Sequence, residues 1–215
     1  MRLIANNCYQ LEHSKGANGY VVSGRAGAAV IDPGISSGYD AVLKELRDSE
    51  ARVGRVTDIA LTHYDFDHAQ AVARLQQELG ARVWLGGADA AILRGDQAPP
   101  TAVRRLMQRF TSIPYPDQLE ELDGTGTIFE GLDYFPTPGH TPGHFAFQWN
   151  TVLFTGDSVT VRKDGTLRQF VLRPVISDRA VAGRTEQLLR ERISSQGIEW
   201  VCAGHNRPTR TNQAA

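Results

Sequence analysis

The chain alternates between short apolar stretches and segments whose apolar residues recur every three or four positions. The short stretches, bounded by glycine, proline and polar residues, predict strands. They cover residues 18–22, 28–31, 58–61, 82–85, 127–129, 132–135, 145–149, 152–154 and 198–203. The helical spacing predicts helices over residues 39–50, 69–79, 101–110 and 177–194. Because hairpins occur early and late, two mixed sheets packed together with helices outside fit better than one parallel, doubly wound sheet.

Residues 86–123 form the longest stretch between well-marked strands. Prolines bracket its single predicted helix, which indicates a semi-rigid lid insertion within one domain spanning residues 1–215. In one interpretation, the apolar face of that helix packs on the core and its arginines are solvated. In the other, the face lines the mouth of a pocket and an arginine attracts an anionic group. The apolar face comprises Val103, Leu106, Met107 and Phe110, and the arginines largely off it are Arg104, Arg105 and Arg109.

Composition excludes few functions and is ordinary for a soluble globular protein; a small-molecule substrate is expected from the chemistry described below. Hydrophobic residues make up 41% of the 215 positions, charged residues make up 22%, and the formal net charge is -1. This balance gives no support to nucleic-acid binding, and no apolar stretch is long enough to cross a membrane. Because the N-terminus lacks a signal-peptide pattern, we expect a cytoplasmic protein, and nothing indicates its oligomeric state. No disulfide is expected between Cys8 and Cys202.

The most informative segment for chemistry, Thr62-His-Tyr-Asp-Phe-Asp-His68, joins a predicted strand to a predicted helix. A turn that leaves a strand can direct alternate side chains into one space, and the first helical turn can direct another to a neighbouring point. Taken singly, each residue has an ordinary alternative as a helix cap, a turn residue or a buried core histidine. Together they predict a metal site with room for two ions, built from His63, Asp65, Asp67 and His68.

Three later segments also place a ligand-type residue directly after a predicted strand. His140 lies in Thr-Pro-Gly-His-Thr-Pro-Gly-His, Asp157 in Phe-Thr-Gly-Asp, and His205 in Ala-Gly-His. A glycine precedes each of the three, which allows the backbone to turn sharply so that the side chain reaches inward. The same metal site is therefore expected to draw on four segments of the chain.

The series His63-x-Asp65-x-Asp67-His68, then His140, Asp157 and His205, resembles the HxHxDH…H…D…H pattern of the metallo-β-lactamase superfamily. The resemblance runs over nearly the whole chain, because Asn18-Gly-Tyr-Val-Val and Val30-Ile-Asp-Pro-Gly match it as well. It implies an α/β fold of the αββα type, a four-layer sandwich of two mixed sheets with helices on the outer faces. The site would lie at one edge between the sheets.

The resemblance also implies a role for each residue. Asp157 would bridge two divalent ions, and His144 would support the site without binding a metal. Asp65 stands where the family has a histidine, and this additional carboxylate favours harder ions, so iron and manganese join the family's zinc as candidates. The first ion would be held by His63, Asp65 and His140, and the second by Asp67, His68 and His205.

The chemistry implied is metal-dependent hydrolysis of a thioester, lactone or other ester. A hydroxide bridging the two ions would attack the carbonyl carbon, and Asp67 could also shuttle a proton. Two alternatives remain open. One is an oxidoreductase similar to persulfide dioxygenases, in which His63, His140 and Asp157 would hold a single iron. The other is a non-catalytic metal-binding protein with the same fold.

Overall fold

The computed structural model describes residues 1–162, 164–170 and 172–211, and its first sheet has seven strands in chain order. The first four strands pair antiparallel, whereas β4 to β7 run parallel to one another. The carboxyl ends of these parallel strands therefore lie at one edge of the sheet. The strands are β1 (Arg2–Ala5), β2 (Cys8–Gln10), β3 (Tyr20–Ser23), β4 (Ala28–Ile31), β5 (Val56–Ala60), β6 (Arg82–Gly86) and β7 (Leu119–Leu122).

The second sheet has six strands in the order β15-β14-β11-β10-β9-β8. Because β9 and β11 both pair antiparallel with β10, and β14 pairs parallel with β11, the strands β9, β11 and β14 share one direction. A separate hairpin consists of β12 (Val159–Val161) and β13 (Leu167–Gln169). The six strands are β8 (Gly126–Phe129), β9 (Leu132–Pro136), β10 (Phe145–Trp149), β11 (Val152–Gly156), β14 (Trp200–Ala203) and β15 (Thr209–Arg210).

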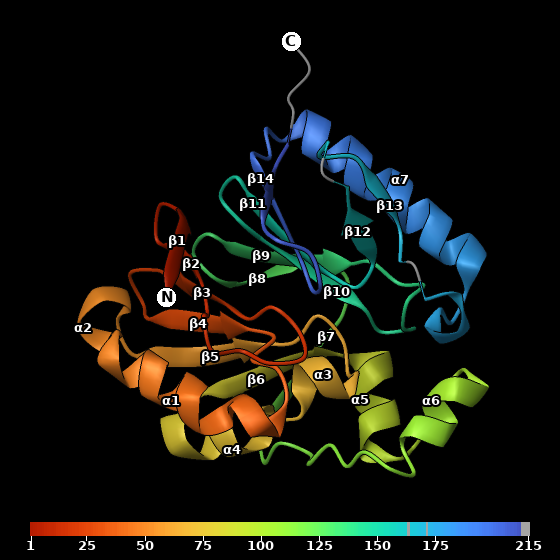
Figure 1. Cartoon of the computed structure of the whole chain (residues 1–215), viewed down its shortest axis with the longest axis horizontal. Coiled ribbons are helices and arrows are strands. Elements are labelled where there is room, and N and C mark those ends of the chain that lie inside the picture. Colours follow the sequence, from red (N-terminus) through yellow and green to blue (C-terminus); the bar gives the residue numbers. More distant parts are fainter. Residues whose placement is uncertain (163, 171, 212–215) are drawn as a thin grey trace.

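Helices cover the outer faces of both sheets (Figure 1). Gly80 ends α4 in the left-handed conformation, as its position after the last apolar residue predicts, and the Asp178 carboxylate caps α7. Within the described part of the chain, no helix is long and apolar enough to span a membrane. The helices are α1 (Tyr39–Asp48), α2 (Glu50–Val53), α3 (Phe66–Ala69), α4 (Val72–Leu79), α5 (Gly87–Arg94), α6 (Ala102–Met107) and α7 (Arg179–Ser195), with 3-10 turns η1 (Ser36–Gly38) and η2 (Arg173–Val175).

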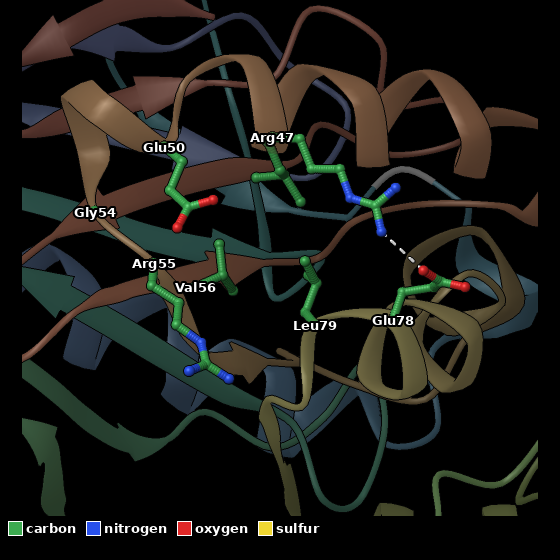
Figure 2. A pocket seen from close by; sticks show the side chains of 8 residues that line it. Arg47, Glu50, Gly54, Arg55, Val56, Glu78 and Leu79 are labelled. Carbon is green, nitrogen blue, oxygen red and sulfur yellow. Dashed lines mark hydrogen bonds and ion pairs between the residues drawn. The ribbon is translucent and has the colours of Figure 1, made fainter.

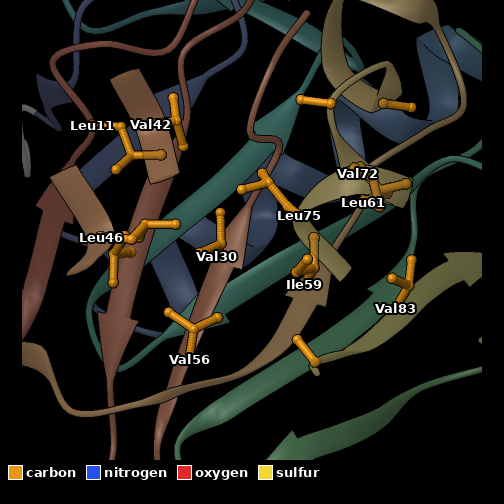
Figure 3. Close-up of a cluster of buried hydrophobic side chains, with 14 of the residues drawn as sticks. Leu11, Val30, Val42, Leu46, Val56, Ile59, Leu61, Val72, Leu75 and Val83 are labelled. Atoms are coloured by element: carbon orange, nitrogen blue, oxygen red, sulfur yellow. The ribbon is translucent and has the colours of Figure 1, made fainter. Parts of the chain in front are cut away.

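Alternating side chains of the strands produce three apolar layers and confirm the αββα fold. In β4, Val30 packs towards α1 and α4, whereas Ala29 and Ile31 face the second sheet. Figure 3 shows the first of these layers, with Val30 and Ile59 of the sheet near Leu46 and Leu75 of the helices. The third layer lies between the second sheet and α7, where Leu153 and Leu189 are buried together.

The prediction for residues 86–123 is wrong in one respect, because the segment holds more than a single helix. It also contains α5 and β7, and β7 pairs with β6 to complete the first sheet. Other strands went unpredicted because they have only two to four residues, namely β1, β2, β12, β13 and β15. The predicted helix at residues 39–50 ends at Asp48, where Ser49 separates α1 from α2.

The interpretation of the 101–110 helix as an apolar face on the core with solvated arginines is wrong for that face and for Arg104, although Arg105 and Arg109 are exposed as it expects. Phe110 is 81% exposed and Leu106 is 55% exposed, whereas Arg104 is only 3% exposed. Burial of a charged guanidinium requires a partner. Arg104 has one in the Asp65 carboxylate, which the helical spacing alone could not reveal.

Candidate metal centre

The segment after β5 leaves the sheet edge in an extended loop and enters α3, with Asp65 at the N-cap position. The backbone amides of His68 and Ala69 donate to the Asp65 carbonyl oxygen, at 3.0 Å each. The Phe145 amide donates to the Thr62 carbonyl at 2.8 Å and ties this loop to the second sheet. The segment is thus fixed between the two sheets, where the sequence predicted the site.

Groups behind His63 and His68 determine which ring nitrogen faces the centre. His63 Nδ1 lies 3.0 Å from the Thr62 hydroxyl, and His68 Nδ1 lies 2.9 Å from Asp32 Oδ2. In both histidines, Nε2 is therefore the nitrogen that remains for a metal. Asp32 also accepts hydrogen bonds from the amide and the hydroxyl of Thr62, so one buried carboxylate orders both the histidine and the loop.

The other three ligand segments meet this loop because β9, β11 and β14 run in one direction and end at the same edge. His140 follows β9, Asp157 follows β11, and His205 follows β14. A side chain at Gly156 would clash with Thr62, and one at Gly204 would lie 2.3 Å from Asp157 Oδ1. These glycines are needed so that the backbone can pass the neighbouring ligands closely.

Asp89, at the start of α5, joins the His63 and His140 loops. Its carboxylate accepts hydrogen bonds from the amides of Tyr64 and Gly143 and from the Thr141 hydroxyl. Burial raises the pKa of Asp89 to about 7, although these hydrogen bonds act to lower it. Sequence reasoning missed Asp32 and Asp89 as site residues, because neither lies in a ligand-type spacing, although Asp32 belongs to a matched motif.

The structure brings all seven predicted residues close together. Two sets offer ligand atoms that all lie within 4.8 Å of one another. Asp157 belongs to the first set, and its Oδ1 lies 3.5 Å from the Nε2 of His68 in the second. Asp157 Oδ2 and Asp67 Oδ2 each lie 3.2 Å from His205 Nε2. The first set is His63, His140 and Asp157, and the second is Asp67, His68 and His205.

The ligand atoms that face the centre are better suited to binding a metal than to forming hydrogen bonds with one another. Among the described residues, the buried atoms without a hydrogen-bond partner include His63 Nε2, His68 Nε2 and Asp157 Oδ1. A buried polar atom without a partner is destabilising, and three such atoms facing one space are what bound cations would satisfy. Imidazole and carboxylate are suitable ligands for zinc, iron and manganese.

Asp65 lies beside the first set but belongs to neither set. Its Oδ2 is 3.1 Å from His140 Nε2 and 3.5 Å from His63 Nε2. Arg104 of α6 binds the same carboxylate at two points. Burial acts against the charge of this arginine, but the ion pair raises the pKa of Arg104. The role of Asp65 as a metal ligand stays a prediction.

Charged pairs of opposite sign hold the rest of the centre together. Hydrogen bonds to Asp157 and Asp67 raise the pKa of His205 to about 9. Burial acts to raise the pKa of Asp157, but the charge of His68 and the hydrogen bond with His205 hold it well below its usual range. The carboxylates are thus ionised at neutral pH and available to a cation.

His144 differs from the seven ligand candidates because both of its ring nitrogens have protein partners. Its Nδ1 lies 2.8 Å from the Thr137 hydroxyl, and its Nε2 accepts a hydrogen bond from the Asp157 amide at 3.3 Å. Its ring also stacks on that of His63 at a centroid distance of 5.0 Å. His144 therefore supports the site, in agreement with the prediction that it is not a ligand.

A pocket of about 780 Å³ opens onto the centre. Its lining includes Asp65, Asp67, His140, Asp157 and His205. The rest of the lining is mostly apolar but carries two arginines, and it includes Phe66, Met107, Phe170, Leu172, Val175, Arg162 and Arg168. A pocket lined by metal-binding groups, apolar side chains and arginines can hold a small molecule with an apolar part and an anionic part.

A second hollow, of about 210 Å³, lies at the opposite end of β5, between α2 and the end of α4 (Figure 2). Val56, the first residue of β5, lines it, whereas the metal-binding segment follows the last residue of that strand. Arg47 and Glu78 form an ion pair there, and the lining includes no histidine or cysteine. The hollow therefore offers none of the chemistry of the first pocket.

Comparison with known proteins shows which family the chain belongs to. Residues 15–205 match the sequence family described as the metallo-beta-lactamase superfamily. A hydroxyacylglutathione hydrolase of Fuscovulum blasticum is 36% identical over 115 residues, which are 53% of this chain and 38% of that protein. One from Cereibacter sphaeroides is 31% identical over 153 residues, covering 70% and 49% of the two chains. The match thus spans at most about half the length of these relatives.

Two solved structures are also similar to this chain. The protein TTHA1623, determined in a di-iron-bound form, is 26% identical with a TM-score of 0.67, and the match covers 92% of this chain and 91% of that one. The metallo-beta-lactamase DIM-1 has a TM-score of 0.73 over 97% of this chain and 90% of its own, but at 14% identity it shows the fold alone.

The αββα fold of the chain agrees with the family whose model matches it. The chain belongs to the metallo-beta-lactamase superfamily, which confirms the resemblance found in its sequence.

Proposed function

We propose that this protein is a dinuclear hydrolase that cleaves a thioester, with a lactone or other ester as the alternative substrate. The observation that carries the proposal is the pair of ligand sets at the pocket, whose lining includes four of their six residues. The names of the curated relatives, which are hydroxyacylglutathione hydrolases, favour the thioester. His63, His140 and Asp157 would hold one ion and Asp67, His68 and His205 the other, with Asp157 near both.

Two divalent ions held in this way supply an acidified water and a Lewis acid for a carbonyl group. The chain's own residues do the remaining work. Phe66 and Phe170 line the pocket and exclude water from the apolar part of a substrate. The hydrogen bond with His205 lowers the pKa of Asp67 against the effect of burial, so its carboxylate can accept and pass on a proton.

The arginines of the β12–β13 hairpin favour a substrate with an anionic group. Arg168 lines the pocket, and its Nε donates to the Thr160 hydroxyl at 3.1 Å. Within the described part of the chain, no carboxylate forms an ion pair with Arg168. Its charge is therefore available to a ligand carboxylate.

A panel of substrates tests this function. The protein is loaded with zinc, iron or manganese and assayed with a hydroxyacyl-glutathione thioester, a lactone and a simple ester. We expect the thioester to be cleaved fastest. Arg168→Gln should raise KM for an anionic thioester by about tenfold and leave a neutral one unchanged. Arg25→Gln, an exposed change at the β3–β4 turn, is the control. No turnover of any of the three substrates with any of the metals would contradict the proposal.

The second candidate is the mononuclear iron oxidoreductase, favoured by the composition of the first ligand set. Its two histidines and one carboxylate are a set found in non-haem iron enzymes. Oxygen uptake with a persulfide substrate, together with a single iron per chain, would support this alternative against hydrolysis. His205→Ala separates the two, because it should abolish dinuclear hydrolysis but leave the single-iron reaction.

A further inference from the structure

Arg104 is the feature of the centre that the proposed hydrolytic function leaves unexplained. It lies on α6, is almost fully buried, and reaches Asp65 with two nitrogens. Nε is 2.8 Å from Oδ1 and Nη2 is 2.6 Å from Oδ2. This is a two-point ion pair, the strongest arrangement between a guanidinium and a carboxylate.

The same guanidinium also contacts the first ligand set. Arg104 Nη2 lies 3.0 Å from His140 Nε2, the nitrogen that faces Asp65 and Asp157. An arginine can only donate, and the Asp65 carboxylate, 3.1 Å from the same nitrogen, can only accept, so the lone pair of this nitrogen is either offered to Arg104 or carries a proton donated to Asp65. That lone pair is the one a metal needs. Arg104 in this position therefore competes with an ion for His140, and its positive charge opposes a second cation nearby.

The second ligand set has no such competitor. Within the described residues, the ion pairs of Asp67 and Asp157 involve only histidines, and those histidines are themselves potential ligands. Asp32 supports His68 from the side away from the centre. The two sets thus differ in the arginine at the first set, in addition to the carboxylate behind His68 in the second.

The segment that carries Arg104 has few anchors of its own. Helix α6 has six residues, and Leu106 on it and Phe110 just beyond it are mostly exposed. Burial of Arg104 is thus the main contact between this helix and the centre, together with Met107 in the pocket wall. A shift of α6 would remove little apolar surface from contact and would carry the guanidinium away from His140.

We propose that Arg104 is an internal cation that closes the first ligand set, so that a metal binds His63, His140 and Asp157 only when the guanidinium leaves His140. Arg104 is a positioning residue in this scheme, and α6 couples the occupancy of one metal to the state of the pocket wall. The inference rests on the proposed metal-dependent function, but it concerns the relative affinity of the two ions and not the reaction.

Metal titration of the chelator-treated protein tests the inference. Zinc binding is followed by calorimetry, with elemental analysis of the saturated protein. Wild type should bind one ion tightly and a second weakly. In Arg104→Gln the weak step should strengthen by about tenfold or more, and the tight step should stay unchanged. Arg105→Gln is the matched control, because Arg105 is on the same helix, exposed, and bonded to the Pro99 carbonyl oxygen.

Asp65→His provides a second, independent variant. It removes the carboxylate that holds Arg104 and supplies an imidazole, so the weak step should again strengthen and shift in preference towards zinc over manganese. Hydrogen exchange of α6 should increase when the second zinc binds to wild type. These two readouts do not depend on activity.

Three outcomes would overturn the inference. An unchanged or weaker second step in Arg104→Gln, with an unchanged thermal unfolding midpoint, would mean that the arginine only holds Asp65 in place as a ligand. Binding of two ions with equal, high affinity by wild type would show that Arg104 does not block the first ligand set. That result would not contradict the proposed dinuclear hydrolase. No metal binding by wild type or variants would overturn the metal-dependent function and this inference together.

Discussion

The two halves of the centre draw ligands from the same loop, yet their surroundings differ. Behind His68 in the second set lies the Asp32 carboxylate, an anion that strengthens the imidazole as a ligand. Behind His63 in the first set lies only the neutral hydroxyl of Thr62, and in front of His140 lies the Arg104 guanidinium. Two sets with similar ligands therefore need not bind a metal with equal affinity, because the groups behind and beside the ligands also influence that affinity.

Loss of Asp157 should weaken both halves, because its carboxylate lies near both sets. Asp157→Ala should lower the occupancy of both ions and reduce activity by more than the roughly 10–100-fold that follows loss of a group behind a ligand. Elemental analysis and kcat/KM measure the two effects. Asp48→Ala, an exposed change on α1, is the control. Retention of both metals with full turnover would remove Asp157 from the centre.

Asp32→Asn should affect the second set more than the first. Asparagine tolerates the positive φ of 49° at this position, so the backbone should be preserved. His68 would lose its anionic partner, and the affinity of the second set should fall by about 10–100-fold. Calorimetric titration should show the tight step weakened and the other step little changed. An equal loss in both steps would indicate a general disturbance of the fold.

Asp89 belongs to the first half, because it joins the His63 and His140 loops. Burial raises its pKa to about 7, so between about pH 4 and pH 7 the folded protein binds a proton that the unfolded chain releases. Stability from this group is therefore present at low pH and lost as pH rises to about 7. The asparagine in Asp89→Asn cannot titrate. The free energy of unfolding of wild type should therefore fall by on the order of 2 kcal/mol relative to that of the variant between pH 5 and pH 8.

Urea unfolding of metal-free wild type and Asp89→Asn at both pH values measures this difference. The hydrogen bonds that the variant loses add a constant offset, so the change with pH is the informative quantity. A gap that stays constant from pH 5 to pH 8 would show that Asp89 is ionised throughout and that its hydrogen bonds outweigh its burial.

The sequence predicted the sandwich and the seven clustered residues because each depended on local signals. Strand ends marked by glycine and followed by histidine or aspartate can be seen without knowledge of the fold. Arg104 could not be predicted, because its partner Asp65 is 39 positions away and only the fold brings them together. Strand β7, Leu-Glu-Glu-Leu, lacks β-branched residues and forms only because β6 offers a free edge.

The smallest expected effects concern the pocket wall formed by α6, where Met107 and Phe110 are three residues apart. Met107 lines the pocket, whereas Phe110 is 81% exposed and does not. Met107→Ala should remove apolar contact with a bound substrate and lower kcat/KM by roughly fivefold for substrates with a bulky acyl group, which corresponds to about 1 kcal/mol. Phe110→Ala should change neither metal content nor substrate preference, which makes it the control.

A shift in preference in Met107→Ala, with both metals retained, would support the idea that residues 86–123 act as a lid that helps to select the substrate. Because Met107 shares α6 with Arg104, the metal titration should be repeated on this variant. If its only effect is a lower unfolding temperature, with preference unmoved, then α6 is a packing element and substrate choice lies with the arginines of the β12–β13 hairpin. A change in the weak metal step would instead link the wall of the pocket to the first ligand set through the helix that they share.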